Sequence, residues 1–448
     1  MSASTTLIPP SLSESSRRRR ERVASIASCI LNLTNTIVGS GMLGLPKAFE
    51  NAGAVMGCIL LIIFASLSGF GLYLLASSAR LCNRVDDASF RAVAEIASPR
   101  FSALIDAAVA IKCFGVATSY LIVVGDAVPR VIGTFSRNFW IILSTIFISP
   151  LCLLDKLDGL KFTSALSLLF VAYLTGMIIT YRFSYGHCGE NCMPSNQTLI
   201  NLRLAKTMTI FVFGFTCHQN IFSVVTEIKR PTSQRISFVI FFSLFIACSV
   251  YIAVAWSGYH TFGKKVQGDI LDNYNASPAV DVARLFVAAL VAFSYPLQCH
   301  PSRNCFLSLL DQCFSSNSIE SYPPALLPQQ QDHSTSMVQQ QDQNEELSSV
   351  VTKGGFRNRF AHSRQARRLT TLCFLFASLL IALSVESLTT VLAIVGATGS
   401  TMVSYVLPGG IYYRLAPPSL IRSCALALFC LGLFVMPTAV CLIFVDID

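Results

Sequence analysis

The chain has 448 residues, of which 53% are hydrophobic and 13% are charged, and its formal net charge at pH 7 is +9. Soluble domains usually carry about 25% charged residues, so this composition excludes an ordinary soluble protein and favours one that lies in a membrane. The positive charge does not indicate nucleic-acid binding, because the Lys and Arg residues lie between long apolar runs, where they set membrane topology.

Apolar segments long enough to cross a bilayer recur throughout the chain. A membrane-spanning helix needs roughly 20 mostly apolar residues, and eleven segments approach this length. They lie near residues 24–46, 54–81, 103–129, 139–154, 161–183, 206–227, 236–262, 281–299, 369–384, 388–413 and 421–445. We therefore expect an all-α integral membrane protein with about eleven transmembrane helices, which is embedded in the lipid bilayer as a monomer.

Two polar stretches interrupt the apolar pattern. Residues 1–22 are rich in Ser and Arg, and residues 315–350 form a Gln-rich tract. Neither can bury enough apolar surface to fold alone, so we expect a disordered cytosolic tail and a disordered cytosolic linker. The linker separates helices 1–8, in residues 23–314, from helices 9–11, in residues 351–448. Its Gln runs are more typical of a tolerated insertion than of a binding module.

The basic residues near the span ends predict the orientation in the membrane. They gather in the N-terminal tail, after the second span, after the sixth span and before the ninth, and these regions share one side if eleven spans are counted. Lys and Arg concentrate in cytosolic loops, so we expect a cytosolic N-terminus and a lumenal or extracellular C-terminus. The basic residues that fall on the far side are an exception: Arg130, Arg137, Lys264 and Lys265.

The loop between the fifth and sixth spans, expected on the far side, offers two covalent modifications. Cys188 and Cys192 lie in the sequence CGENC, and a compartment outside the cytosol permits a disulfide between them. Two unpaired thiols are the alternative, and a zinc site is weaker because only His187 is nearby as a further ligand. Asn196 begins an Asn-Gln-Thr sequon and is a candidate for glycosylation.

The first span contains residues that interrupt a helix. Its segment NTIVGSGMLGLP, Asn35–Pro46, holds three glycines and a proline, and both residue types weaken a helix. The sixth span carries a matching interruption, where Gly214, Thr216 and His218 stand within an apolar segment. Spans 1 and 6 are each the first helix of a five-span half. Interrupted helices at matching positions in two halves indicate an inverted-repeat transporter.

Two broken helices that face each other at the middle of the membrane suit a zwitterionic ligand. Half-helix N-termini offer N–H groups to a carboxylate, and unwound carbonyls can hold an ammonium group or an ion. An amino acid carries both charges, so we expect an amino acid substrate to bind at the breaks. The candidate binding residues are Thr36, Ile37, Val38, Gly39, Ser40, Gly41, Phe213, Gly214, Thr216 and His218. The alternative for the glycines is a small-residue packing face.

Four motifs follow one another in the order NLTNTIVGSGMLGLPKAFENAG, FTCHQNIFSVVTEIKRPT, SYPLQCHPSRN and AIVGATGSTMVSYVLPG. Together they resemble the amino acid/auxin permease family, which includes vacuolar amino acid transporters and sodium-coupled neutral amino acid transporters. The resemblance covers all eleven spans and leaves out the tail and the Gln-rich linker. It implies a LeuT-like five-plus-five inverted repeat with one extra helix, and symport or antiport by alternating access.

The coupling ion stays open between a proton and sodium, and no other cofactor or metal is expected. In sodium-coupled relatives an asparagine at the place of Asn35 is linked to the ion, and Ser294 in the eighth span is a second candidate ligand. His218 is the candidate for proton coupling, because His titrates near neutral pH, although a packing role is its alternative. The forms CHQN and YPLQCHPSR are similar to the vacuolar branch. They favour protons and a vacuolar or lysosomal membrane over the plasma membrane.

The leading function is therefore a secondary active transporter of amino acids. An amino-acid sensor of the same fold with little transport is the alternative, although the tail contains no recognisable partner motif. An enzyme is not expected, since the sequence holds no metal-ligand cluster, no Ser/His/Asp set and no phosphate loop. Lys112 in the third span keeps two open roles, a snorkelling side chain or part of a gate. Asp106 lies six residues before it and does not share its helix face.

Overall fold

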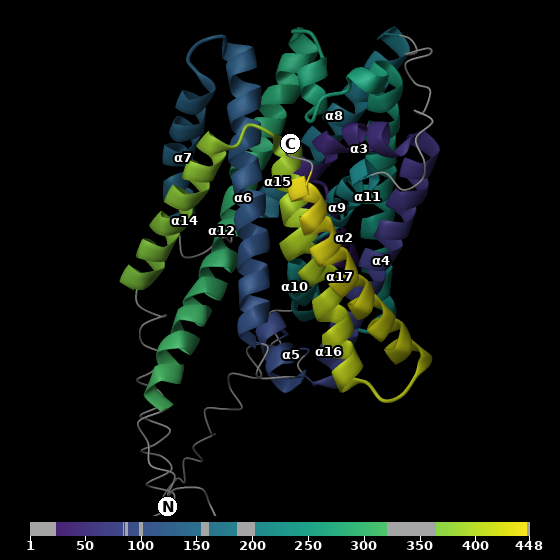
Figure 1. Ribbon diagram of the computed structural model, residues 1–448, viewed down its shortest axis with the longest axis vertical. Helices are drawn as coiled ribbons and strands as arrows, with labels where there is room; N and C mark the ends of the chain where they lie inside the picture. Colours follow the sequence, from purple (N-terminus) through teal and green to yellow (C-terminus); the bar gives the residue numbers. More distant parts are fainter. Residues whose placement is uncertain are drawn as a thin grey trace, which may run out of the picture.

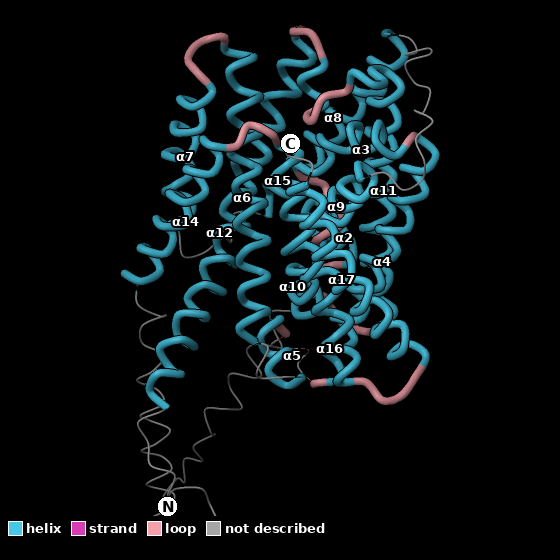
Figure 2. Tube along the Cα trace, viewed as in Figure 1, coloured by secondary structure: helices cyan, strands magenta, loops and turns pink. Residues whose placement is uncertain are grey.

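The protein is a bundle of helices in the computed structural model, which describes residues 24–83, 85, 88–97, 102–153, 161–185, 202–319 and 364–445. Helices account for nearly all of these residues (Figure 2). A single β-bridge within them joins Ala24 to Ile228, and it ties the start of the first span to the end of the sixth.

The elements follow one another as expected for a chain that crosses a membrane many times (Figure 1). They are α2 (Ile26–Ile37), η1 (Ser40–Gly44), α3 (Leu45–Ala52), α4 (Ala54–Leu81), α5 (Phe90–Ala97), α6 (Ser102–Ile132), α7 (Arg137–Leu153), α8 (Lys161–Tyr185), α9 (Leu202–Gly214), η5 (His218–Asn220), α10 (Ile221–Glu227), α11 (Ser233–Phe262), η6 (Gly263–Lys265), η7 (Ile270–Asn273), α12 (Pro278–Ile319), α14 (Arg364–Ser384), α15 (Leu388–Val395), η8 (Gly396–Ser400), η9 (Met402–Val406), α16 (Leu407–Leu415) and α17 (Leu420–Val445).

The number of spans agrees with the sequence once short and bent helices are included. Nine helices of the described chain are long and apolar enough to cross a membrane, and the bent pair α2 and η1–α3 makes a tenth. The remaining predicted span corresponds to α7, whose 17 residues lie at the lower limit for a crossing. The short helix α5 was not expected as an element and lies between the second and third spans.

Several expectations fall on residues that the structure does not describe. These are the tail 1–22, the candidate disulfide Cys188–Cys192 and the sequon at Asn196. The first residues of the predicted Gln-rich linker, 315–319, belong to α12, which ends at Ile319. The rest of the linker also lies outside the described residues.

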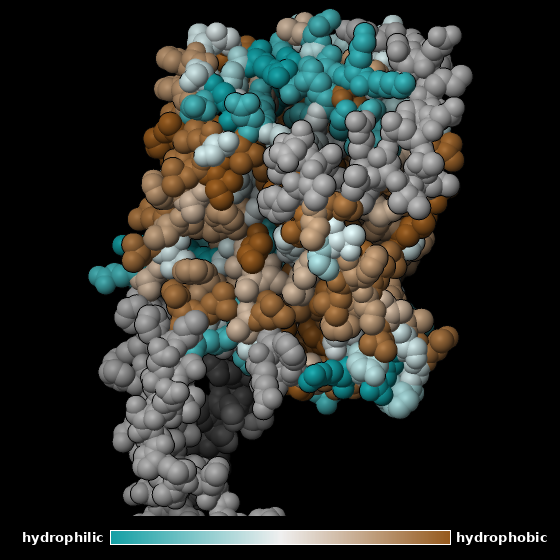
Figure 3. All heavy atoms as spheres, in the orientation of Figure 1, coloured by the Kyte–Doolittle hydropathy of each residue, from teal (hydrophilic) through white to brown (hydrophobic). Residues whose placement is uncertain are grey.

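The surface carries the apolar band that a bilayer requires. Figure 3 shows brown, hydrophobic side chains around the middle of the molecule and hydrophilic ones gathered at its upper end and at the lower right. Large apolar side chains such as Phe147, Phe241 and Phe434 are more than half exposed. In water this exposure would be unfavourable, so these side chains identify the lipid-facing surface.

Burial separates an inner set of spans from an outer set. The most apolar windows of α6, of α9–α10 and of α15–α16 are 78%, 78% and 83% buried, whereas those of α8, α14 and α17 are 28%, 28% and 22% buried. The inner spans are the third, sixth and tenth. A site placed among them is enclosed by protein and not by lipid.

Candidate substrate site between the broken helices

The first span breaks where its glycines predict. α2 ends at Ile37, the backbone of Val38 and Gly39 is extended, and the 3-10 turn η1 begins at Ser40. The two halves of the span meet at an angle of 48°. The last carbonyls of α2 and the first N–H groups of η1 lack partners within their helices. The break therefore places polar backbone groups inside the bundle.

The sixth span is interrupted as well, without the sharp bend of the first. α9 ends at Gly214, and the helix resumes through η5 at His218 and α10 at Ile221. The Thr216 hydroxyl donates to the carbonyl of Val212 at 2.6 Å. A side chain of the interruption therefore bonds to a carbonyl of the same span.

One tyrosine lies at the ends of both broken helices. The hydroxyl of Tyr251, on α11, is 2.6 Å from the carbonyl oxygen of Ile37 and 2.9 Å from that of Gly214. These residues end α2 and α9, so a single O–H group serves two carbonyls that the breaks leave without helical partners. Tyr251 is fully buried, and it connects the two breaks.

Side chains also link the breaks to each other and to the third span. The amide of Asn220 donates to the hydroxyl of Thr36 at 2.7 Å, which joins η5 to α2. The hydroxyls of Ser40 and Ser119 are 3.2 Å apart, and Ser119 itself donates to the carbonyl of Val116. The first break is thereby fixed against spans 6 and 3.

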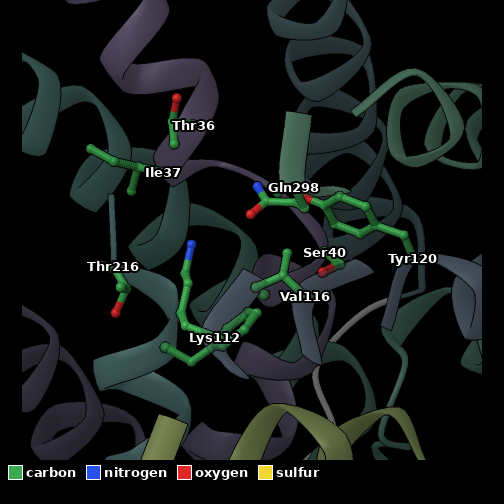
Figure 4. A pocket seen from close by; sticks show the side chains of 11 residues that line it. Thr36, Ile37, Ser40, Lys112, Val116, Tyr120, Thr216 and Gln298 are labelled. Atoms are coloured by element: carbon green, nitrogen blue, oxygen red, sulfur yellow. The ribbon is translucent and has the colours of Figure 1, made fainter. Parts of the chain in front are cut away.

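A cavity lies between the two breaks and spans 3 and 8 (Figure 4). Its lining residues are Thr36, Ile37, Gly39, Ser40, Gly41, Lys112, Val116, Tyr120, Phe213, Thr216 and Gln298. The volume open to the centres of water molecules is about 20 Å³, which is room for about one water. An amino acid would need more space than this.

Lys112 is the charged group of this cavity. Its side chain, on α6, is 3% exposed, and in Figure 4 its ammonium group points into the cavity between Thr216 and Gln298. None of the ion pairs between described residues includes Lys112. A buried ammonium group without a carboxylate partner is unfavourable, and the carboxylate of a ligand would remove that cost.

The glycines of the first break allow close packing around the cavity. A Cβ atom on Gly41 would lie 3.1 Å from two ring carbons of Phe213, whereas one on Gly39 would lie 3.5 Å from the hydroxyl of Tyr120. The first distance is tight and the second is ordinary van der Waals contact. Gly41 therefore leaves no room for a larger side chain, while Gly39 leaves some.

His218 lies beside the cavity and does not line it. Its ring is fully buried, and its Nδ1 is 3.1 Å from the hydroxyl of Ser404 on η9. Its Nε2 is 2.7 Å from the position that a Cβ on Gly71 would occupy, and it has no hydrogen-bond partner among the described residues. This position suits the packing alternative, and a proton-coupling role would act through its neighbours.

Four other candidates also lie away from the cavity lining. Val38 and Gly214 belong to the breaks but do not line the cavity. Asn35 is in α2, and its side-chain oxygen is buried without a hydrogen-bond partner among the described residues. Ser294 is half-buried within α12. The seven remaining candidates line the cavity: Thr36, Ile37, Gly39, Ser40, Gly41, Phe213 and Thr216.

The glycines of the tenth-span motif bring that span close to its neighbours. A Cβ on Gly396 would lie 2.0 Å from the carbonyl oxygen of Thr209, and one on Gly399 would lie 2.8 Å from backbone atoms of Lys112. The backbone between Gly396 and Val406 is largely π-helical. This motif therefore supports the site by packing on α9 and α6, without lining the cavity.

A loop outside the membrane-spanning helices covers the first break. The carbonyl oxygen of Gly268 is 3.7 Å from where a Cβ of Gly44 would lie. Asp269 follows it and accepts a hydrogen bond from the N–H of Leu271 at 2.8 Å. Burial, and then the nearby carboxylate of Asp272, raise the pKa of Asp269 to about 7.

Sequence reasoning missed several of the residues that shape the site. Tyr120, Val116 and Gln298 line the cavity, and Tyr251 connects the breaks. Gln298 lies within the SYPLQCHPSRN motif, so the motif was a usable signal. Tyr251 stands alone in an apolar helix, and no local pattern distinguishes it from a core aromatic residue.

The broken first span, the interrupted sixth span and the cavity between them define a membrane transporter of the LeuT-like class. The chain belongs to the family of transmembrane amino acid transporter proteins, whose model matches residues 22–445. This membership confirms the resemblance seen in the motifs, and it makes the protein a transporter and not an enzyme.

Curated relatives and a solved structure support the same class. The chain is 34% identical to vacuolar amino acid transporter 5 of Schizosaccharomyces pombe over 87% of this chain and 84% of that protein. It is 32% identical to vacuolar amino acid transporter 6 of Saccharomyces cerevisiae, over 93% and 98%. A crystal structure of the manganese transporter of Eremococcus coleocola shares the fold, with a TM-score of 0.53, 10% identity, and coverage of 94% of this chain and 88% of that chain.

Proposed function

We propose that this protein is a secondary active amino acid transporter of a vacuolar or lysosomal membrane, and that protons drive it by alternating access. The cavity between the broken helices carries this proposal, because it combines a glycine-lined backbone break with a buried ammonium group that is in none of the ion pairs between described residues. The substrate carboxylate would meet Lys112 and the N–H groups at the start of η1. The substrate ammonium group would meet carbonyls at the end of α2.

Coupling to protons is supported by the titratable groups beside the cavity. Lys112 lines the cavity and His218 lies beside it, and both side chains are buried. A buried ammonium group at the cavity also opposes entry of a second cation. Sodium remains the second candidate, because the buried side-chain oxygen of Asn35 has no hydrogen-bond partner among the described residues and could coordinate a cation.

The orientation is part of the proposal. We propose a cytosolic N-terminus and a lumenal C-terminus, from the distribution of basic residues. In Figure 1 the arginine-rich start of α14 lies toward the lower end of the molecule, which would be the cytosolic end. Helix α17 runs from the lower to the upper end, so its C-terminal end would be lumenal. Protease treatment of sealed vesicles should distinguish tags placed at the two termini. Equal protection of both tags would contradict an odd number of spans.

Transport is tested with the full chain in proteoliposomes. A panel of amino acids is offered under an imposed pH gradient without sodium, and then under an imposed sodium gradient at equal pH. The proposal expects uptake that follows the pH gradient alone. It also expects His218→Gln to flatten the pH profile more than it lowers maximal uptake.

Two results would change the assignment. If uptake requires sodium and ignores the pH gradient, and Asn35→Ala weakens the apparent sodium affinity, the coupling ion is sodium. If amino acids bind tightly but neither gradient drives uptake, the protein is a sensor of the same fold.

A further inference from the structure

A second cavity lies where α12 and α14 meet, away from the broken helices. Its lining residues are Leu153, Arg303, Arg364, Arg367 and Arg368. Four of the five are arginines, and none carries a carboxylate. Transporter function as proposed above makes no use of this cavity.

Arg303 is the buried member of this set. Its side chain is 5% exposed, and among the described residues its guanidinium group contacts the hydroxyl of Thr371 at 3.2 Å, the carbonyl of Cys152 at 3.5 Å and Nδ1 of His300 at 2.7 Å. Its Nε has no hydrogen-bond partner among the described residues. A buried cation without an anionic partner is costly, and none of the ion pairs between described residues includes Arg303. An anion in the cavity would therefore interact favourably with Arg303.

The other three arginines are placed against the helix dipole. Arg364, Arg367 and Arg368 stand in the first five residues of α14, whose first turn contains no acidic residue. The N-terminus of a helix carries partial positive charge, so cations there are unfavourable and anions are favourable. An anion bound at this end would interact favourably with the dipole, with the exposed Arg364 and Arg368 and with Arg303.

The geometry favours a phosphate monoester over a weaker anion. Arginine presents a planar fork of N–H donors that matches phosphate oxygens. A monoester carries up to two negative charges and three terminal oxygens, which can engage several guanidinium groups. A carboxylate offers one charge and two oxygens, and it would leave more of the arginine charge uncompensated.

The surface beside the cavity fits acyl chains. Leu369, Leu372 and Phe376 follow the arginines along α14, and they are 65%, 50% and 62% exposed. Figure 3 shows hydrophilic side chains at the left edge, level with the start of α14, and hydrophobic ones above them. A lipid whose headgroup enters the cavity would therefore lay its chains along an apolar strip of the same helix.

We propose that this cavity binds a phosphate monoester group, with the headgroup of a phosphorylated lipid of the adjacent leaflet as its source. The same chemistry is present in soluble phosphate monoesters. Basic pockets between transmembrane helices are suited to anionic headgroups in general. Here the buried side chain of Arg303 fixes the position of the site in the fold.

The test uses the full chain purified in detergent, with bound lipid counted by native mass spectrometry. Phosphatidic acid has a phosphate monoester headgroup, phosphatidylserine is anionic but is a diester, and phosphatidylcholine has no net charge. We expect phosphatidic acid to bind at least tenfold more tightly than phosphatidylserine. Glycerol 3-phosphate provides the soluble arm.

Matched variants locate the site. The double variant Arg364→Gln with Arg368→Gln alters exposed side chains and should fold, and it should weaken phosphatidic acid binding at least tenfold. Arg303→Gln should weaken it further. Arg422→Gln, at the start of α17, removes one charge from another helix and should leave binding unchanged.

Each outcome has a defined meaning. Loss of binding in the double variant but not in Arg422→Gln supports the site with a lipid source. If glycerol 3-phosphate binds as tightly as phosphatidic acid and the double variant weakens it equally, the result supports the site with a soluble source. Equal binding of phosphatidic acid and phosphatidylserine, or an equal loss in Arg422→Gln, overturns the proposal in favour of diffuse surface charge.

Discussion

The sequence interrupts both broken spans at matching positions, but the two breaks do different things in the structure. The first break contributes Gly39, Ser40 and Gly41 to the cavity, where backbone can approach a ligand. In the second break, Ser404 donates to the hydroxyl of Thr216 at 3.1 Å and also lies 3.1 Å from His218. The first break thus exposes backbone to the cavity. The second break is held mainly by hydrogen bonds to side chains of neighbouring helices.

The difference follows from what each break is made of. Glycines add no side chain, so they leave backbone groups accessible and leave space for a substrate. Polar side chains in an apolar interior must find hydrogen-bond partners, and those of the second break find them in spans 1 and 10. An interruption in hydropathy therefore indicates where a span breaks, while the residue types within it show how far side-chain hydrogen bonds hold that break.

The largest expected effect is that of Gly41→Val. Its Cβ would lie 3.1 Å from the ring of Phe213, and two further methyl groups would fill the cavity, so we expect uptake to be abolished. Gly39→Ala adds a Cβ at an ordinary 3.5 Å from Tyr120 and should retain most of the uptake. Both variants are measured in proteoliposomes, after size-exclusion chromatography has confirmed folding. Normal uptake by Gly41→Val would remove the first break from the substrate site.

Lys112→Met has the next largest expected effect, because it removes the positive charge that lines the cavity opposite the first break. Hydrogen bonds to charged groups contribute about 1.5–3 kcal/mol, so loss of the ammonium group should weaken the apparent substrate affinity roughly 10- to 100-fold. Lys47→Met is the control, since Lys47 pairs with Glu50 at 2.8 Å on α3 and does not line the cavity. An unchanged KM in Lys112→Met would mean that the substrate carboxylate binds elsewhere.

The sequence predicted the fold well because the bilayer imposes strong rules. Spans need length and apolarity, and loops carry the basic residues, so span positions follow from composition alone. The break at Gly39–Gly41 was also predictable, because few residues other than Gly and Pro interrupt a helix. The milder interruption at Thr216 was visible as polar residues within an apolar run.

The site was less predictable, because its side chains come from helices that look uniform in sequence. Lys112 stood out as a charge within a span, yet its direction depends on how α6 is rotated against its neighbours. Tyr251 and Tyr120 resemble any buried aromatic residue until the hydroxyl partners are known. His218 attracted attention as a titratable group, but the packing of α4 and η9 around it decides that it does not line the cavity.

A pH effect is expected at the loop that covers the first break. An unfolded Asp has a pKa near 3.8, whereas in the folded protein burial and Asp272 raise the pKa of Asp269 to about 7. The folded state therefore holds this proton more tightly, and the stabilisation is full below about pH 4 and is lost as the pH rises to about 7. Between pH 5 and pH 8 the loss amounts to about 2–3 kcal/mol.

Asp269→Asn isolates this contribution. The amide cannot ionise, so thermal unfolding of the variant should depend less on pH than that of the wild-type chain, with the two differing most at pH 8. Glu386→Gln, at an exposed position between α14 and α15, is the control. Parallel pH profiles for wild type and Asp269→Asn would show that Asp269 does not titrate in this range.

Tyr251→Phe has the smallest expected effect and bears most directly on the relation between the two breaks. The ring still packs in place, but the carbonyls of Ile37 and Gly214 lose the hydroxyl that both contact. Leaving a buried carbonyl unsatisfied costs about 1–3 kcal/mol of stability. The Tyr251 hydroxyl has one proton to donate, so its removal should cost about one such hydrogen bond. The unfolding temperature should fall by a few degrees.

If Tyr251 also fixes the spacing of the breaks, KM for the substrate should rise as well. Tyr405 is another fully buried tyrosine, and Tyr405→Phe should leave KM unchanged. A loss of stability with an unaltered KM would mean that Tyr251 supports the helix ends, while the two breaks keep their spacing through Asn220 and Thr36.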